Sequence, residues 1–99
     1  MLTHIVLIRL RDEATPEQVD ALVDGLRALP AQIPAVASYT VSRDLGLVEG
    51  NHGVAIVARF ASPEDLTTYL EHPAHVAVVR DLIPPVSDER ARIQIPALS

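Results

Sequence analysis

Four segments of the chain carry hydrophobic patterns that are typical of β-strands. Residues 2–10 and 52–60 contain runs of consecutive apolar side chains, which indicates burial on both faces, since a strand with one wet face alternates polar and apolar positions. Residues 36–43 alternate moderately, and residues 89–95 form a last short strand that Pro96 closes. The first and third of these strands are therefore expected to lie in the middle of a sheet.

A first helix is predicted between the first two strands, with a clear start signal. Residues 15–18, Thr-Pro-Glu-Gln, combine an N-cap threonine, a proline at the first helical position and a glutamine that completes a capping box. Apolar residues then recur every three or four positions and form one stripe. The stripe consists of Val19, Leu22, Val23, Leu26 and Leu29. Pro30 is expected to end the helix, because it lacks the backbone N–H that the helical ladder needs.

A second helical region is predicted after the third strand, with a break inside it. Residues 62–65, Ser-Pro-Glu-Asp, repeat the capped start. His72-Pro73 interrupts the pattern, because the residue before a proline avoids helical backbone angles. A second helical piece is expected over residues 74–83, and Pro84 stops it. The apolar residues expected to point inward from this piece are Val76, Val79, Leu82 and Ile83.

The order strand, helix, strand, strand, broken helix, strand predicts a ferredoxin-like α+β fold. One antiparallel four-stranded sheet with both helical regions on one face satisfies this order within a single domain of residues 1–99. Such a layout leaves the other sheet face bare, although two strands are apolar on both faces. Because monomers rarely expose large apolar patches, we expect a homodimer in which two sheets pack face to face. A different protein partner is the alternative cover.

Composition and charge remove several classes of partner. The net charge is −5 and only 3% of the 99 residues are aromatic, so the chain lacks the clustered cations and stacking platforms that bind nucleic acids. No apolar run is long enough to span a membrane, and no cationic leader precedes the first strand. We therefore expect a cytoplasmic protein with neither a membrane nor a nucleic-acid partner.

Missing residue types narrow the chemistry further. The chain has no cysteine, and all eight of its cationic residues are arginine, which excludes thiolate chemistry, disulfides and Schiff-base catalysis by lysine. His72 and His75 have a spacing that could hold a metal in a continuous helix, but Pro73 interrupts it and only Glu71 offers a further ligand. The sequence predicts no metal site and no cofactor.

His75 and Tyr69 are the first candidates for chemistry. His75 is expected near the start of the helical piece that follows the break, where an imidazole can exchange a proton near neutral pH. Tyr69 precedes the break and can donate a hydrogen bond to a developing enolate oxygen. The competing interpretation is structural: His75 caps backbone groups around the bend, and Tyr69 is an amphipathic core residue.

The first strand supplies a second group of candidates. His4, Val6 and Ile8 share one strand face and are expected to point into the same cavity. A lone histidine on an apolar face is more often a satisfied core residue than a catalyst. Arg90 and Arg92 lie close together on the last strand; one could hold a ligand carboxylate, and a surface position is the simpler interpretation.

Three segments together resemble the stress-responsive A/B barrel (Dabb) family. Residues 4–13, HIVLIRLRDE, look like its opening strand, and residues 33–36, IPAV, resemble the entry to its second strand. Residues 69–75, YLEHPAH, are similar to its most distinctive segment, a tyrosine followed by a His-Pro-x-His motif. The resemblance covers nearly the whole chain in the same element order, and it implies a dimeric α+β barrel.

The resemblance also implies roles for particular residues. A plant member of the family, olivetolic acid cyclase, catalyses aldol cyclisation of a linear polyketide, and its catalytic tyrosine and histidine match Tyr69 and His75. Its first-strand pocket histidine matches His4. The acid that supports its catalytic histidine falls at Gln94 here, and a glutamine supplies a hydrogen bond without a full negative charge. This departure weakens the match to a cyclase.

Two classes of function remain from the sequence. The first is a protein that binds a small apolar or carbonyl-containing ligand in a pocket between helices and sheet, with His75 as base and Tyr69 as donor in a polyketide-cyclase-like reaction. The pocket would include His4, Val6, Ile8 and Gln94 as ligand-binding residues. The second is a non-catalytic, stress-associated dimeric structural protein whose His-Pro-x-His segment serves folding. A monooxygenase of the related barrel superfamily is more distant, since no haem or flavin motif is present.

Overall fold

Residues 1–97, the part of the chain that the computed structural model describes, form four strands and four helices in the predicted order. The last two residues of the predicted domain of residues 1–99 lie outside this part. The elements are β1 (Leu2–Arg9), α1 (Pro16–Arg27), α2 (Leu29–Gln32), β2 (Val36–Arg43), β3 (Val54–Phe60), α3 (Pro63–Glu71), α4 (Pro73–Asp81) and β4 (Glu89–Pro96).

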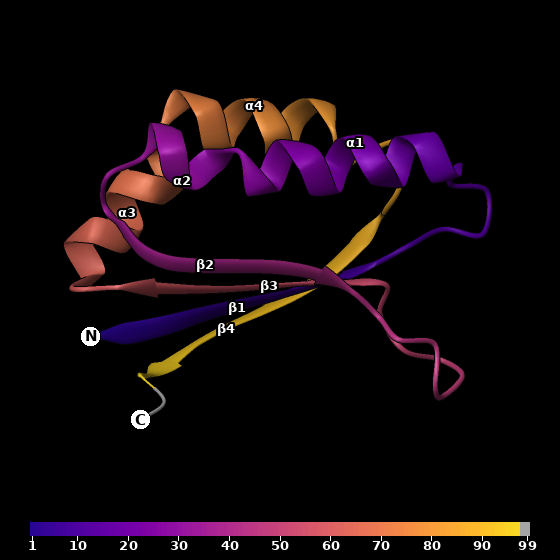
Figure 1. The fold of residues 1–99 in the computed structure, drawn as a ribbon, viewed down its shortest axis with the longest axis horizontal. Coiled ribbons are helices and arrows are strands. Elements are labelled where there is room, and N and C mark those ends of the chain that lie inside the picture. Colours follow the sequence, from indigo (N-terminus) through magenta and orange to yellow (C-terminus); the bar gives the residue numbers. More distant parts are fainter. Residues whose placement is uncertain (98–99) are drawn as a thin grey trace.

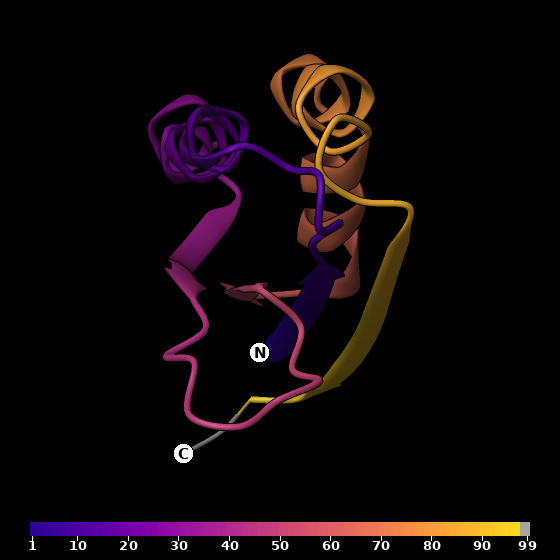
Figure 2. The ribbon, with the colours of Figure 1, turned by 90° about the vertical axis from the view of Figure 1, so that its right-hand side faces the viewer.

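The four strands form one antiparallel sheet in the order β2-β3-β1-β4. All helices lie on the same side of this sheet, with α1 and α4 running side by side above it (Figures 1 and 2). This arrangement confirms the predicted ferredoxin-like α+β fold. It places β1 and β3, the strands with the longest apolar runs, in the centre of the sheet, as their sequences predict.

Both predicted helix starts are present. The Thr15 hydroxyl accepts a hydrogen bond from the Gln18 backbone N–H at 3.2 Å, and the Gln18 side chain accepts one from the Thr15 N–H at 2.9 Å, which completes the capping box. At the start of α3 the Ser62 hydroxyl accepts a hydrogen bond from the Asp65 N–H at 3.2 Å. The predicted break is also confirmed: His72 ends α3 with an extended backbone, and α4 begins at Pro73.

Two local predictions are wrong. Pro30 does not end the helical region but lies in the first turn of the short helix α2. Backbone N–H groups in a first turn make no hydrogen bond within the helix, so proline is tolerated there. Val76 is 44% exposed, while Val78 is buried at 7% exposure. Because the helix restarts at Pro73 after the break at His72, different residues of α4 face the core, and Val78 points inward where Val76 does not.

The hydrophobic core lies between the sheet and the helices. The stripe predicted for α1 is buried as expected, together with the side chains of β1 and β3 that point toward the helices. Within residues 1–97, no helix lies on the opposite face of the sheet, and only the connection between β2 and β3 extends to that side (Figure 2). There Leu7 is 37% exposed and Ile93 is 56% exposed. The predicted two-sided burial of β1 is therefore not achieved within a single copy of the chain.

Candidate functional site

A pocket of about 410 Å³ lies between the sheet and the helices. Its wall is largely apolar, and its polar groups come from one strand pair and from the broken helix. The lining residues are His4, Val6, Leu26, Ile56, Tyr69, Leu70, His75, Val79, Ile83, Arg90 and Arg92. This size and this mixture of surfaces are typical of sites for small molecules.

The pleat of the central strands brings His4 and Val6 into this pocket. Successive side chains of a strand point to opposite faces, so residues 4, 6 and 8 of β1 all point toward the helices. His4 lies opposite Ala58 of β3, and that alanine leaves room above the strand. Ile8 shares the same face but is fully buried in the core and does not line the pocket.

The helix break places Tyr69 and His75 side by side. Tyr69 lies in the last turn of α3, and His75 lies in the first turn of α4. The side chain of His72 accepts a hydrogen bond from the Ala74 N–H at 3.1 Å and so caps α4. The rings of Tyr69 and His75 then meet with their centroids 4.4 Å apart.

The hydrogen bond of His75 defines which of its nitrogens is basic. Nδ1 of His75 lies 3.1 Å from the carbonyl oxygen of Leu70. A carbonyl oxygen only accepts, so Nδ1 carries the proton, and Nε2 of the neutral ring is the free proton acceptor. Burial lowers the pKa of His75; the Leu70 carbonyl opposes this shift, and Arg90 adds to it. At neutral pH the imidazole is therefore uncharged and able to act as a base.

His4 has the complementary arrangement. Its Nδ1 lies 2.9 Å from Nε2 of Gln94, its cross-strand partner on β4. With the amide nitrogen as donor, Nδ1 accepts, and Nε2 of the neutral ring carries the proton. Burial lowers the pKa of His4, and His75 and Arg92 lower it further. The glutamine that the resemblance assigns to support of the catalytic histidine thus bonds His4 and not His75.

Tyr69 is bonded to a residue that sequence reasoning did not select. The hydroxyls of Tyr39 and Tyr69 are 2.7 Å apart, and Tyr69 is 1% exposed. Burial raises the pKa of both phenols, so both stay protonated at neutral pH. Tyr39 is half-buried on β2, and its position on the helix-facing side of that strand is the one sequence signal that could have found it.

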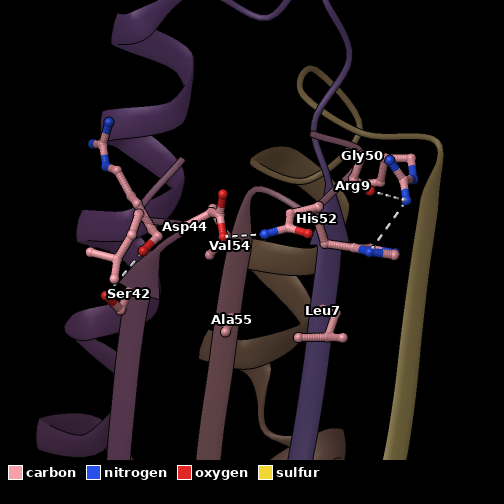
Figure 3. A pocket seen from close by; sticks show the side chains of 11 residues that line it. Leu7, Arg9, Ser42, Asp44, Gly50, His52, Val54 and Ala55 are labelled. Carbon is pink, nitrogen blue, oxygen red and sulfur yellow. Dashed lines mark hydrogen bonds between the residues drawn. The ribbon is translucent and has the colours of Figure 1, made fainter. Parts of the chain in front are cut away.

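A second hollow lies on the opposite face of the sheet. It has a volume of about 530 Å³ and lies between the central strands and the β2–β3 connection, residues 44–53. Figure 3 shows Leu7 and Ala55 on its floor and Arg9 near Gly50 and His52 at its upper end. Arg9 donates to the Gly50 carbonyl at 3.2 Å. None of the predicted site residues lines this hollow.

Neither a metal centre nor a membrane span is built into the described part of the chain. Within residues 1–97, histidine and carboxylate side chains do not gather in groups of three that could hold a metal ion. Each helix of that part is too short or too polar to cross a bilayer.

A four-stranded antiparallel sheet with all helices of residues 1–97 on one face defines the chain as a small ferredoxin-like α+β protein. The comparison with protein families identifies the family within this class. The sequence matches the Stress responsive A/B Barrel Domain over residues 2–96, and the chain belongs to this family.

Known proteins with related sequences and structures agree with this assignment. A stress-response A/B barrel domain-containing protein of Arabidopsis thaliana is 29% identical over 91 residues, which cover 90% of this chain and 34% of that protein. The chain thus spans about a third of the length of this relative. A dimeric ferredoxin-like protein of unknown function from Thermobifida fusca is 35% identical, with a TM-score of 0.88 over 97% of this chain and 90% of that one.

An enzyme shares the fold. The hydroxynitrile lyase from Passiflora edulis is 17% identical, with a TM-score of 0.82 over 95% of this chain and 90% of that one. At this identity the likeness concerns the fold alone.

Proposed function

We propose that this protein is a homodimer that binds a small apolar, carbonyl-containing ligand in the pocket between helices and sheet and catalyses proton transfer on it. The observation that carries this proposal is the orientation of His75. Its Nδ1 is occupied by the Leu70 carbonyl, which leaves Nε2 as a free base in a pocket that Tyr69 and His4 also line. A lyase with this fold, from Passiflora edulis, supports the idea that the scaffold carries catalysis.

The proposed reaction is proton abstraction beside a carbonyl group, as in polyketide cyclisation. Nε2 of His75 takes a proton from the carbon next to the carbonyl, and the electron pair of that C–H bond moves to the carbonyl oxygen as an enolate. Tyr69 and the protonated Nε2 of His4 donate hydrogen bonds to this oxygen. In an aldol step the enolate carbon then bonds to a second carbonyl carbon of the ligand, and His75 returns its proton to the new alkoxide.

The pocket departs from the cyclase pattern in one respect. Gln94 bonds His4, so His75 has a backbone carbonyl as its partner and no carboxylate to stabilise its protonated form. Such a base is weaker than one supported by an acid. The chemistry proposed here therefore needs a carbonyl compound whose proton is already acidic, such as a β-dicarbonyl.

The open sheet face supports the proposed homodimer. Leu7 and Ile93 on this face are 37% and 56% exposed in a single copy. A second sheet packed against this face would remove these apolar side chains from water. The β2–β3 connection lies on the same side of the sheet, away from the helices (Figures 1 and 2). Its exposed apolar side chains are Leu45, Leu47 and Val48.

A non-catalytic structural protein is the second candidate. One specific observation favours it: the His75–Leu70 hydrogen bond ties the two halves of the broken helix together. In that case His75 stabilises the bend, and its Nε2 atom takes no part in a reaction.

Deuterium exchange into a β-keto ester, a β-dicarbonyl compound, separates the two candidates. We expect the protein to accelerate exchange at the carbon between the two carbonyl groups of ethyl 2-methyl-3-oxooctanoate in D₂O, followed by NMR, and we expect His75→Gln to lower this acceleration about 100-fold, as loss of a general base does. His52→Gln, on the open face, is the control and is expected to keep the wild-type rate. Binding of the β-keto ester is checked separately by the rise in Tm.

Two results would overturn catalysis. The first is a β-keto ester that binds without accelerated exchange. The second is an exchange rate that His75→Gln leaves unchanged. A His75→Gln protein with a much lower Tm and no change in exchange would favour the structural role of the bend.

A further inference from the structure

Two arginines of β4, Arg90 and Arg92, border the pocket. Arg90 and Arg92 lie opposite Ile8 and Val6 of β1, so they share the helix-facing side of the sheet with His4. Both line the pocket, and both are exposed at its mouth. Sequence reasoning treated a surface role as the simpler one for these residues. The strand register instead directs both side chains toward the candidate base and its neighbours.

Within residues 1–97, these two cations have no acidic side chain paired with them. Ion pairs of other arginines are present, namely Arg9–Glu89, Arg11–Asp88, Arg43–Asp20 and Arg80–Asp81. Within residues 1–97, Arg90 and Arg92 make no ion pair or side-chain hydrogen bond, although the chain as a whole carries a net charge of −5. None of the eleven residues that line the pocket is acidic. Glu89, their acidic neighbour in β4, pairs with Arg9.

The interior beyond these arginines is apolar. Leu26, Ile56, Val79 and Ile83 form its wall, and the positive charges stand only at the mouth. Side chains two apart on a strand lie roughly 7 Å from each other, a spacing over which two guanidinium groups can share one oxyanion. The charges also act on the site itself, since Arg92 lowers the pKa of His4 and Arg90 lowers that of His75.

We infer that Arg90 and Arg92 form an anion subsite, and that the ligand of this pocket is an apolar molecule with a carboxylate at one end. The inference rests on the proposed function of the pocket as a ligand site. A carboxylate matches the planar guanidinium fork, while the apolar wall takes the rest of the molecule. The carboxylate at the mouth then orients the chain so that its carbonyl groups lie inside, near His75 and Tyr69.

Calorimetric titration with matched acids and amides tests this subsite. The probes are octanoate against octanamide and 4-phenylbutanoate against 4-phenylbutanamide, which differ only in the charged group. The proteins are the wild type, Arg90→Gln, Arg92→Gln, the double variant, and Arg80→Gln as control. Arg80 is an exposed arginine of α4 that pairs with Asp81 and does not line the pocket. Because both target side chains are exposed, the variants are expected to fold, which circular dichroism checks.

We expect the acids to bind more tightly than the amides. The double variant is expected to weaken acid binding at least about tenfold, with the single variants between, because each lost bond to a charged group costs more than a neutral one. Amide binding is expected to change less than about twofold, and Arg80→Gln is expected to behave as the wild type. Acid binding is also expected to weaken as salt is raised.

The contrary outcomes separate the subsite from the pocket. If acid and amide bind equally well to the wild type and to the double variant, the anion subsite is wrong and the ligand pocket stands. If the acids bind but Arg80→Gln weakens them as much as Arg90→Gln, the effect is one of general charge, and the subsite is wrong. If no probe of either kind binds, the proposed ligand pocket is itself overturned, and the subsite with it.

Discussion

The two faces of the sheet are made from the same strands but have different surroundings. On the helix-facing side, alternate residues of β1 and β3 lie under α1 and α4, where they form the core and the walls of the pocket. On the other side no helix of residues 1–97 covers the intervening residues, and Leu7 and Ile93 remain accessible. A one-residue step along β1 thus moves from His4, which lines the pocket, to Ile5, which lies on the open face.

This contrast separates chemistry from assembly. The pocket on the covered side holds two histidines, His4 bonded to Gln94 and His75 bonded to the Leu70 carbonyl. The open face holds accessible apolar side chains, among them Leu7 and Ile93. An apolar strand needs burial on both sides, and this chain supplies it on one. The second copy that we propose would complete the burial without touching the pocket.

The largest predicted effect comes from a charge on the open face. Ile93→Glu places a carboxylate on a side chain that is 56% exposed in one copy, so the single chain is expected to fold. In the proposed dimer the charge would be buried without a partner, at a cost of about 3–5 kcal/mol for each copy. We expect light scattering to show a dimer for the wild type and a monomer for this variant at micromolar concentration.

Val76→Glu is the matched control for this experiment. Val76 is 44% exposed on α4, on the helix side of the molecule, so the same charge there is expected to leave the dimer intact. A wild-type protein that is a stable monomer would refute the homodimer. Dissociation by Val76→Glu as well would show that the open face is not the specific surface.

The covered face can be tested through its pair of tyrosines. Removing either hydroxyl of the 2.7 Å bond between Tyr39 and Tyr69 leaves the other phenol partly buried without its partner. We expect each phenylalanine variant to lose about 1–2 kcal/mol of unfolding free energy, and the double variant to lose less than the sum of the two. Urea denaturation at a fixed protein concentration measures all four proteins. Strictly additive losses would mean that the hydroxyls do not depend on each other.

Local signals in the sequence located most of the fold. Capping residues at Thr15 and Ser62 and the break at His72 act through neighbours within a few positions, and each is present where the sequence predicts it. The apolar runs correctly marked β1 and β3 as central strands. The wrong predictions at Pro30 and Val76 have a common cause, which is the start of a new helix. At Pro30 the sequence predicts the end of a helix, but the short helix α2 begins there. At Val76 the predicted apolar stripe does not allow for the restart of the helix at Pro73.

The site depends on register across strands, which a single sequence does not reveal. His75 and Tyr69 could be paired from the sequence because only a helix break separates them. The partner of Gln94 could not, since the β1–β4 register sets it opposite His4. The same register turns Arg90 and Arg92, which are exposed as the sequence predicts, toward the pocket. Tyr39 escaped notice because its bond to Tyr69 joins β2 to α3 across the core.

The smallest predicted effect is a pH dependence that arises only on the covered face. Burial holds the pKa values of His4 and His75 below the ordinary 6.5, so between the folded and unfolded values the unfolded chain binds more protons than the folded one. The unfolding free energy therefore rises with pH in this window. The contribution of the two neutral histidines is fully present above about pH 7 and is lost as the solution is acidified toward about pH 5. The effect is bounded at about 1.4 kcal/mol per pH unit for each group.

Thermal unfolding at a fixed protein concentration between pH 7 and pH 5 measures this slope. His4→Gln/His75→Gln is expected to flatten it, because the unfolded chain then no longer gains these two protons. The carboxyl groups of Asp81 and Asp88 do not interfere, since hydrogen bonds from Arg80 and Arg11 lower their pKa values below the ordinary 3.8 and their contributions are lost only at more acidic pH. If the stability of the double variant falls with pH as steeply as that of the wild type, the acid sensitivity does not come from the two histidines of the pocket. The two faces of the sheet would then differ only in how their side chains are packed.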